Sequence, residues 1–424
     1  MRESFLHFIW QFQKFNTIEL TTSDRQPLQI YSIGNYNTDA GPDFLNAKLL
    51  IGDITWYGHI ELHLKSSDWN RHKHQHDEGY NNVVLHVVWE HDEEVQSASG
   101  QVLPVLELQE RIKPDLLRKC NQLIKNPEKI PCASQFHQVR NIDKLAMLDQ
   151  AGVARLKQKS EMVLQQLAKN NGNWEETVYQ LLAKNFGFKT NEDSFLKLAE
   201  SVSHKILIRH AEQERESEAL IFGMAGFLVG SEDSYHAELR KEFNYLSKKY
   251  KLEELAMIRA EWKYLRLRPG NFPTVRLGQF SAFFRKNSKC FDQFIHYTDQ
   301  KELLALFDFD VSKYWKEHYD FGKKSKRAVK KLGKSSIDLI FINTVAPLLA
   351  AYSQYTDDHT YMDKAIALLQ NVKPEKNHII TMWENLDFKA KDAFDSQALI
   401  GLRNEFCLKK KCLSCKIGVS LINS

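Results

Sequence analysis

The sequence contains no uninterrupted apolar stretch of the roughly 18 residues that a membrane-spanning helix requires. The nearest candidate, residues 337–351, is interrupted by Asp338, Asn343 and Pro347, so we expect a buried helix there. The opening residues, MRESFLHFIWQFQ, carry charged side chains and no small-residue cleavage site, which is unlike a secretory signal. We therefore expect a cytoplasmic protein without a membrane partner.

Cysteine is scarce as well. Six cysteines in 424 residues are too few for a disulfide framework, and they favour a reducing compartment. Neither charge dominates, because the formal net charge is +4 and charged residues make up 26% of the chain. With 43% apolar residues, the composition is typical of a soluble globular protein. No fixed internal period is present, which argues against a solenoid.

The pattern of apolar and polar residues changes near residue 112 from strand-like to helical. The length of the chain predicts two or three domains. An aromatic-rich helix is expected over residues 2–15. Strand-like runs follow at 28–33, 44–51, 54–65, 83–89 and 102–108. Amphipathic helical segments follow at 141–169, 174–186, 193–211, 214–229, 234–249, 252–264, 274–287, 300–317, 335–354, 360–371 and 391–406. We predict an α/β (α+β) domain over 1–112, a connecting segment over 113–135 and an all-α region over 136–424.

Histidine is concentrated in one short stretch. Seven of the sixteen histidines lie between His59 and His91. Histidine is the commonest metal ligand and the side chain most easily set for proton transfer near neutral pH. This stretch, together with Asp43 just upstream, is where we expect the chemistry of the protein.

Within residues 54–65, strand alternation places Glu61, His63 and Lys65 on one face and apolar side chains on the other. If 44–51 and 54–65 form a hairpin around Gly52, Asp43 comes close to Glu61 and His63. Two convergent carboxylates suit Mg²⁺ or Mn²⁺. We expect Asp43 and Glu61 to bind the ion, and His63 or Lys65 to position the attacking water.

The predicted order of helix, three strands, helix and strand resembles the PD-(D/E)XK superfamily of restriction-endonuclease-like nucleases. Pro42 and Asp43 match the first half-motif of that family, and Glu61 matches the acid of the second. The family usually has lysine two residues after this acid, whereas this chain has His63, with Lys65 one step further on the same face. The resemblance implies a central mixed sheet in residues 1–112 and metal-dependent cleavage of nucleic acid. The whole chain also resembles an uncharacterised bacterial family, in stretches such as DAGPDF, SSDWNRHKH and YNNVVLHVV.

Two further clusters offer other metal ligands. A mixed zinc site is an alternative that would use the residues His72, His74, His76, Asp77 and His86. Another interpretation of these histidines is a polar loop that lines a phosphate-binding cleft. The second cluster, a C-terminal group joined by one distant cysteine, would hold zinc or an iron–sulfur cluster, and consists of Cys132, Cys407, Cys412 and Cys415. A precedent for such a cluster exists within the resembled superfamily, and free thiols are the alternative.

Basic residues are dense in two places of the helical region and predict contacts with phosphate backbones. The first group comprises Lys323, Lys324, Lys326, Arg327, Lys330, Lys331 and Lys334. The second comprises Arg266, Arg268 and Arg276. A solvated helix face is the alternative for the first group, and pairing with acidic helix faces is the alternative for the second.

These features together predict a metal-dependent nuclease with DNA or RNA as partner. Two alternatives stay open at this point. One is a non-catalytic nucleic-acid- or protein-binding scaffold with a nuclease-like fold, and the other is a zinc-dependent hydrolase that uses the histidines between His59 and His91.

Overall fold

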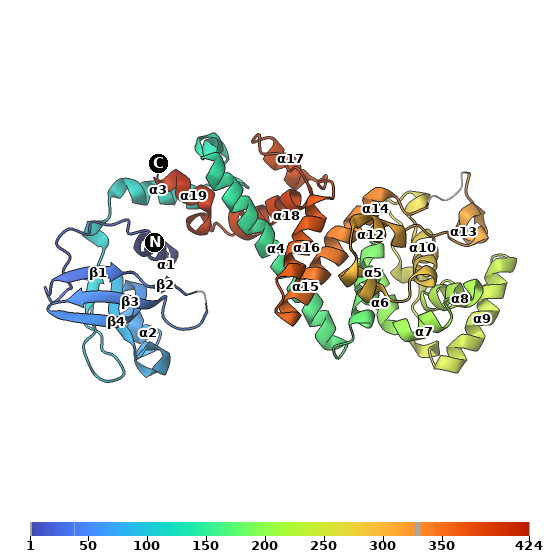
Figure 1. Cartoon of the computed structure of the whole chain (residues 1–424), viewed down its shortest axis with the longest axis horizontal. Helices are drawn as coiled ribbons and strands as arrows, with labels where there is room; N and C mark the ends of the chain where they lie inside the picture. Colours follow the sequence, from blue (N-terminus) through green and yellow to red (C-terminus); the bar gives the residue numbers. More distant parts are fainter. Residues whose placement is uncertain (1, 38, 327–330, 424) are drawn as a thin grey trace. The chain divides into compact units, whose positions relative to one another are not determined.

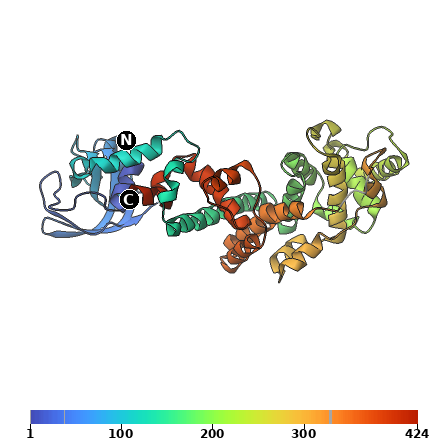
Figure 2. The ribbon, with the colours of Figure 1, turned by 90° about the horizontal axis from the view of Figure 1, so that it is seen from above.

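The computed structural model describes residues 2–37, 39–326 and 331–423, and it divides into two compact units (Figure 1). Unit 1 comprises Met1–Leu148 and Leu402–Ser424, and unit 2 comprises Asp149–Gly401. This division differs from the predicted segments, because the C-terminal segment belongs with the N-terminal residues. The helix α19 (Lys416–Asn423) lies beside α3 (Pro114–Lys125) in both views (Figures 1 and 2). The predicted connecting segment therefore contains a helix, which begins at Pro114, where proline's fixed φ is favourable.

Unit 1 contains a mixed sheet with the strand order β1-β3-β4-β5-β6, and the short β2 pairs with β3. Its strands are β1 (Leu28–Ser32), β2 (Asn35–Tyr36), β3 (Phe44–Ile51), β4 (Ile54–Lys65), β5 (Val83–Glu90) and β6 (Val105–Glu107). Strands β1, β3 and β4 are antiparallel, whereas β4, β5 and β6 run parallel. A sheet followed by a large helical region agrees with the predicted fold class.

Strands β3 and β4 form the expected hairpin, with Ile51 paired to Ile54 across the turn. Gly52 occupies the turn with φ +58°, a conformation that glycine adopts without steric cost. A bulge between Phe44 and Ala47 interrupts the ladder before Phe44 pairs with Ile60. The residues next to that last pair are Asp43 and Glu61, so the hairpin brings them side by side.

The polar face of β4 is covered rather than solvated. Glu61 and His63 are buried, as are Ile60 and Leu62 on the opposite face. The crossover between β4 and β5 contains α2 (Asp68–Arg71), η1 (His74–His76) and η2 (Glu78–Tyr80). Trp69 of α2 is fully buried against this face, where its ring contacts His74 and His86. An acidic and an imidazole side chain are thereby enclosed inside unit 1.

The N-terminal helix α1 (Glu3–Gln11) also contacts β4, and it is shorter than predicted. Its aromatic side chains Phe5, Phe8 and Trp10 are buried. The Trp10 indole N–H donates to the carbonyl of Ile33, just before β2. This anchoring holds α1 against the sheet, beside the start of β3.

Unit 2 is helical, apart from the short strands β7 (His318–Asp320) and β8 (Lys323–Lys324). The long helix α4 (Asn141–Lys169) begins in unit 1 and ends in unit 2. The other helices are α5 (Trp174–Phe186), α6 (Glu192–Ser201), α7 (His204–Arg209), α8 (Glu214–Met224), α9 (Ser234–Tyr250), α10 (Pro273–Lys286), α11 (Cys290–His296), α12 (Gln300–Leu306), α13 (Lys313–Glu317), α14 (Lys334–Ile340), α15 (Ala346–Thr356), α16 (Thr360–Gln370), α17 (His378–Glu384) and α18 (Ala393–Gly401). A phenylalanine-rich core joins them.

Residues 252–264 differ most from the sequence prediction. In place of a helix, they contain two short 3₁₀ turns, Glu253–Leu255 and Arg259–Glu261. The Met257 N–H donates to the carbonyl of Met224, and the Trp262 indole N–H donates to that of Ala225. These bonds satisfy the carbonyls at the end of α8, so tertiary contacts override the local helical pattern.

The stretch Lys334–Thr356, which runs from α14 through a π-helical turn into α15, contains the apolar segment 337–351. Among the described residues it is the one helical stretch whose length and composition would suit a membrane span. Of its most apolar window, 72% is buried inside the structure, as in the core helix of a globular unit.

Candidate metal centre in unit 1

Asp43 is held against β4 by two hydrogen bonds that use the backbone, one to Glu61 and one from Leu62. The Asp43 N–H donates to Glu61 Oε2 at 3.1 Å, and the Leu62 N–H donates to Asp43 Oδ2 at 2.9 Å. Glu61 is buried, whereas the side chain of Asp43 retains 20% exposure. The hairpin therefore places these two acidic residues beside each other at one of its ends.

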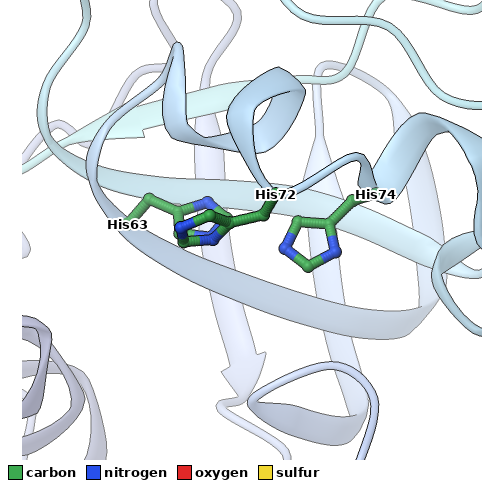
Figure 3. Close-up of side chains that lie close together, drawn as sticks. All are labelled: His63, His72 and His74. Carbon is green, nitrogen blue, oxygen red and sulfur yellow. The ribbon is translucent and has the colours of Figure 1, made fainter.

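The second oxygen of Glu61 faces imidazole groups. Glu61 Oε1 lies 3.5 Å from His63 Nε2 and 3.5 Å from His74 Nε2. His72 Nδ1 lies 3.1 Å from the same His63 nitrogen. Each of these three histidines offers one nitrogen, and those nitrogens lie within 4.8 Å of one another (Figure 3). Three ring nitrogens thus converge beside β4, and a carboxylate oxygen of Glu61 lies 3.5 Å from two of the rings.

His86, on β5, orients His63 from behind. The two strands pair in parallel so that His86 stands opposite Glu61, and His86 Nε2 lies 2.9 Å from His63 Nδ1. The sequence predicted His86 only as an alternative metal ligand. It contacts the site through His63 while being fully buried itself.

Two aromatic side chains, Tyr80 and Trp69, complete the enclosure. The ring of Tyr80 lies against His74, with centroids 3.9 Å apart. Trp69 contacts both His74 and His86, and its indole N–H donates to the carbonyl of Gln96. These contacts fix the orientation of two imidazole rings.

Burial sets the protonation of the site. It raises the pKa of Glu61 to about 9, with a further contribution from the Asp43 carboxylate. Burial, followed by the neighbouring His86, lowers the pKa of His63 to about 2, and burial lowers the pKa of His86 to about 3. The pKa of His74 is lowered for the same reason. Neutral imidazole is the form that binds metal ions, and a bound cation would favour the ionised Glu61.

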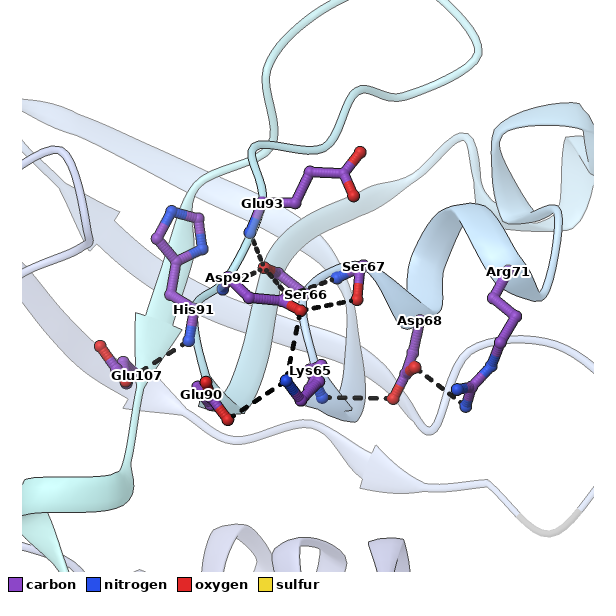
Figure 4. A network of polar contacts seen from close by, with 10 residues as sticks. All are labelled: Lys65, Ser66, Ser67, Asp68, Arg71, Glu90, His91, Asp92, Glu93 and Glu107. Atoms are coloured by element: carbon purple, nitrogen blue, oxygen red, sulfur yellow. Dashed lines mark hydrogen bonds and ion pairs between the residues drawn. The ribbon is translucent and has the colours of Figure 1, made fainter.

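Lys65, a candidate for positioning water, takes part in a different polar network. Its ammonium nitrogen lies 3.5 Å from Glu90 Oε2 and 3.6 Å from Asp92 Oδ2 (Figure 4). Asp92 also accepts hydrogen bonds from Ser66 and Ser67. This network fixes the end of β4 to the loop after β5.

His76 and Asp77 stand at the edge of the site. His76 is exposed in the turn η1. Asp77 is also exposed, and its side chain accepts the Gly79 N–H at the start of η2. Of the predicted alternative ligands, the structure thus brings together His72 and His74, backed by His86.

Sequence reasoning missed His7 and Tyr36. His7, on α1, places Nε2 3.3 Å from Asp43 Oδ2, and its other ring nitrogen lies 3.3 Å from the Tyr36 hydroxyl on β2. The one available signal was a histidine within the otherwise aromatic face of the first helix. His7 lies thirty-six residues before Asp43 in the sequence, and this separation gave no reason to expect contact between these two residues.

Most of the chain matches the model of one protein family. Residues 3–378 match the model of a protein family of unknown function, DUF2851. The chain belongs to this family. The predicted resemblance to an uncharacterised family is thereby confirmed. Neither a curated protein nor a solved structure matches the chain.

The four candidate cysteines, Cys132, Cys407, Cys412 and Cys415, are all buried within unit 1. Burial, and then the thiols of Cys415 and Cys412, raise the pKa of Cys132 to about 12. The C-terminal cysteines therefore do return to Cys132. Thiolates of a tetrahedral zinc site with bonds of about 2.3 Å lie about 3.8 Å apart. In the part of the chain that the structure describes, the histidine group has three ligand atoms within 4.8 Å of one another, and the sulfurs of the four cysteines are not grouped so closely.

Several predicted phosphate-binding residues have partners within unit 2. The ammonium groups of Lys323, Lys331 and Lys334 lie 3.3, 2.8 and 3.0 Å from carboxylate oxygens of Asp320, Asp308 and Asp338. These three lysines are therefore paired with acidic side chains of their own unit.

Arg276 also has an internal role. It stacks on Phe188 and donates to Gln279 and Asn271. Four other members of the two basic groups are exposed, namely Arg266, Arg268, Lys324 and Lys326. Arg327 and Lys330 lie outside the described residues.

Proposed function

We propose that the protein is a cytoplasmic, divalent-metal-dependent nuclease that hydrolyses phosphodiester bonds of DNA or RNA. The observation that carries this proposal is the pair Asp43 and Glu61, locked together at the end of a hairpin beside the neutral imidazole of His63. A divalent cation at such a site activates water and stabilises charge on a phosphoryl oxygen.

The order of the elements supports the choice of phosphodiester chemistry. Helix α1, strands β1, β3 and β4, helix α2 and strand β5 follow one another as in the predicted resemblance to PD-(D/E)XK nucleases. Pro42 and Asp43 precede β3, and Glu61 lies on β4, at the two half-motif positions. His63 stands at the usual lysine position and is the candidate for orienting water.

Asp43 is the more accessible of the two acids, which suits a group that exchanges protons with substrate or water. His7 lies beside the Asp43 carboxylate, and the side chain of His7 is half-buried. The exposed Arg266 and Arg268 of unit 2 would add sequence-independent affinity for phosphate backbones.

The test is incubation of the purified chain with single- and double-stranded DNA and RNA, in Mg²⁺, Mn²⁺ or Zn²⁺. Asp43→Asn and Glu61→Gln preserve side-chain shape and backbone contacts, and each should reduce cleavage by at least about 100-fold. His76→Ala, in the exposed turn beside the site, is the matched control. Cleavage that survives both acidic substitutions, or no cleavage by the unaltered chain in any metal, would refute the nuclease proposal. Salt-sensitive binding without cleavage would instead support the non-catalytic scaffold.

The convergence of His63, His72 and His74 favours a second candidate, a zinc-dependent hydrolase of a small substrate. This candidate shares the site and differs in the substrate. Hydrolysis of small phosphate or carboxylate esters in zinc, with polymeric nucleic acid left intact, would distinguish it.

A further inference from the structure

We propose that Glu61, His63, His72 and His74 bind one transition-metal ion of the zinc class, with Asp43 outside the ligand set. This deepens the proposed function, since its relevance to catalysis rests on the nuclease proposal, whereas the binding of the ion is tested separately. It replaces the hard ion between two carboxylates that the sequence alone suggested.

The first argument is the spacing of the ligand atoms. With bonds of about 2.0–2.1 Å, neighbouring ligand atoms are about 3.3 Å apart in a tetrahedral site and about 3.0 Å in an octahedral one. Glu61 Oε1 lies 3.5 Å from His63 Nε2 and from His74 Nε2, and His63 Nε2 lies 3.1 Å from His72 Nδ1. These three separations are each close to such an edge, and the facing nitrogens of the three histidines lie within 4.8 Å of one another.

The second argument is that two of the atoms turned toward the centre, Glu61 Oε1 and His74 Nε2, lack a better partner. Glu61 Oε2 accepts the Asp43 N–H, which leaves Oε1 with contacts of 3.5 Å, beyond the usual length of a hydrogen bond. The Nε2 atom of His74 is buried and has no hydrogen-bond partner. Buried polar atoms are nearly always satisfied, so an unpaired nitrogen facing a carboxylate oxygen calls for a missing ligand.

The third argument is the support behind the ligands. His63 Nδ1 contacts His86 Nε2, so a proton on Nδ1 would leave Nε2 as the free donor toward the ion. Tyr80 and Trp69 hold the ring of His74. Rigid support of this kind is what distinguishes a prepared metal site from histidines that are merely close in sequence.

The ligand atoms determine which metal ions the site would bind. The exposure of the ligands determines whether the site is closed or open to substrate. Three imidazoles and one carboxylate suit Zn²⁺, Co²⁺, Mn²⁺ or Fe²⁺, whereas Mg²⁺ prefers oxygen ligands throughout. Glu61 and His63 are buried, while His72 is exposed at the mouth. Substrate or water therefore has a route to the ion, as a catalytic site requires.

Asp43 is placed outside the ligand set because one of its carboxylate oxygens has partners on β4 and α1. Its Oδ2 accepts the Leu62 N–H and lies 3.3 Å from His7 Nε2. Asp43 acts on the site through its backbone N–H, which holds Glu61 in place. Asp43→Asn keeps that backbone bond and should leave metal affinity unchanged.

The experiment is titration of the chelator-treated full chain with Co²⁺, followed by its visible absorption, and then displacement by Zn²⁺. We expect one ion per chain and a spectrum of nitrogen–oxygen coordination. His72→Ala and His74→Ala should each weaken affinity by at least about 10-fold, since ligands matter no less than their supporting groups. His76→Ala should bind as the unaltered chain does.

His72 is exposed, so His72→Ala leaves the fold intact and keeps the test informative even if His74→Ala does not fold. Unchanged affinity in His72→Ala, or absence of stoichiometric Co²⁺ binding, would overturn the proposal. Tight binding by a chain that cleaves no nucleic acid would refute the nuclease function and retain the metal site. Cleavage in Mg²⁺ that His72→Ala and His74→Ala leave unaffected would retain the nuclease and refute this site.

Discussion

Asp43 and Glu61 are eighteen positions apart in the sequence and are joined by a hydrogen bond, in which the Asp43 backbone N–H donates to Glu61 Oε2 at 3.1 Å. This bond directs one carboxylate oxygen to the backbone and the other to His63 and His74. The hairpin register, set by the Gly52 turn and the bulge after Phe44, produces this relationship. The proximity of the two acids therefore depends on strand pairing more than on the local sequence around either acid.

Metal binding should slow hydrogen exchange in unit 1. A ligand at 100 times its Kd stabilises the binding-competent state by about 2.7 kcal/mol, so amides that exchange through opening of the site should slow about 100-fold. We expect this protection in β4 and in residues 66–76 when Zn²⁺ is added, measured by mass spectrometry of peptides. Peptides from α16 in unit 2 serve as the internal control. Equal uptake in β4 with and without the ion would contradict the account.

His86→Phe should weaken the metal site without touching the ion. His86 Nε2 lies 2.9 Å from His63 Nδ1, and loss of such an orienting partner typically reduces metal affinity by about 10–100-fold. Competition titration with a chromophoric chelator measures the effect, and circular dichroism checks the fold. Zn²⁺ affinity equal to that of the unaltered chain would show that His86 is only a core residue.

How much of this structure can be predicted from the sequence depends on whether the interactions that form each element are local or long-range. Strands β3 and β4 have the predicted bounds, because period-two alternation is a local signal that packing reinforces. The segment 252–264 was wrongly predicted to be helical, because its bonds to the end of α8 are long-range. His7 was missed because the packing of α1 beside β3 is a tertiary contact, which the spacing of residues in the sequence does not indicate.

The candidate site shows the same limit. The meeting of Asp43 and Glu61 followed from a hairpin that can be read from the chain. The role of His72 and His74 depends on the crossover between β4 and β5 folding back over the polar face of β4, which alternation cannot reveal. The sequence accordingly favoured an acid pair, whereas the packed crossover favours a mixed site.

Glu218 in unit 2 predicts a pH-dependent stability. Burial raises its pKa to about 7, against 4.5 for the free group, and its Oε2 accepts hydrogen bonds from Tyr235 and Trp315. Between these pH values the unfolded chain releases the proton while the folded chain retains it, so stability falls as pH rises. The loss reaches about 3 kcal/mol above pH 7 and is absent below pH 4.5.

Urea unfolding at several pH values between about 5 and 8, followed by far-ultraviolet circular dichroism, measures this effect. Glu218→Gln keeps an acceptor oxygen and cannot ionise, so its stability should exceed that of the unaltered chain at the alkaline end and approach it at the acidic end. Parallel pH profiles of the two proteins would show that Glu218 does not carry the proton.

The basic residues of unit 2 should separate into two kinds. Arg276→Ala removes a half-buried guanidinium stacked on Phe188 and should cost about 2 kcal/mol of stability. Arg266→Ala combined with Arg268→Ala should leave stability within about 0.5 kcal/mol. The double variant should also lower the salt dependence of nucleic-acid binding, by about 0.9 in logarithmic slope for each phosphate that an arginine no longer neutralises. Fluorescence anisotropy at several salt concentrations measures the slope, and an unchanged slope would remove these arginines from the interface.

The most direct measurement is anomalous X-ray diffraction from crystals of the full chain grown with Zn²⁺, recorded on both sides of the zinc absorption edge. The account predicts one peak, about 2.0–2.2 Å from Glu61 Oε1 and from the facing nitrogens of His63, His72 and His74. A peak bound by other residues, or none at this position, would contradict it.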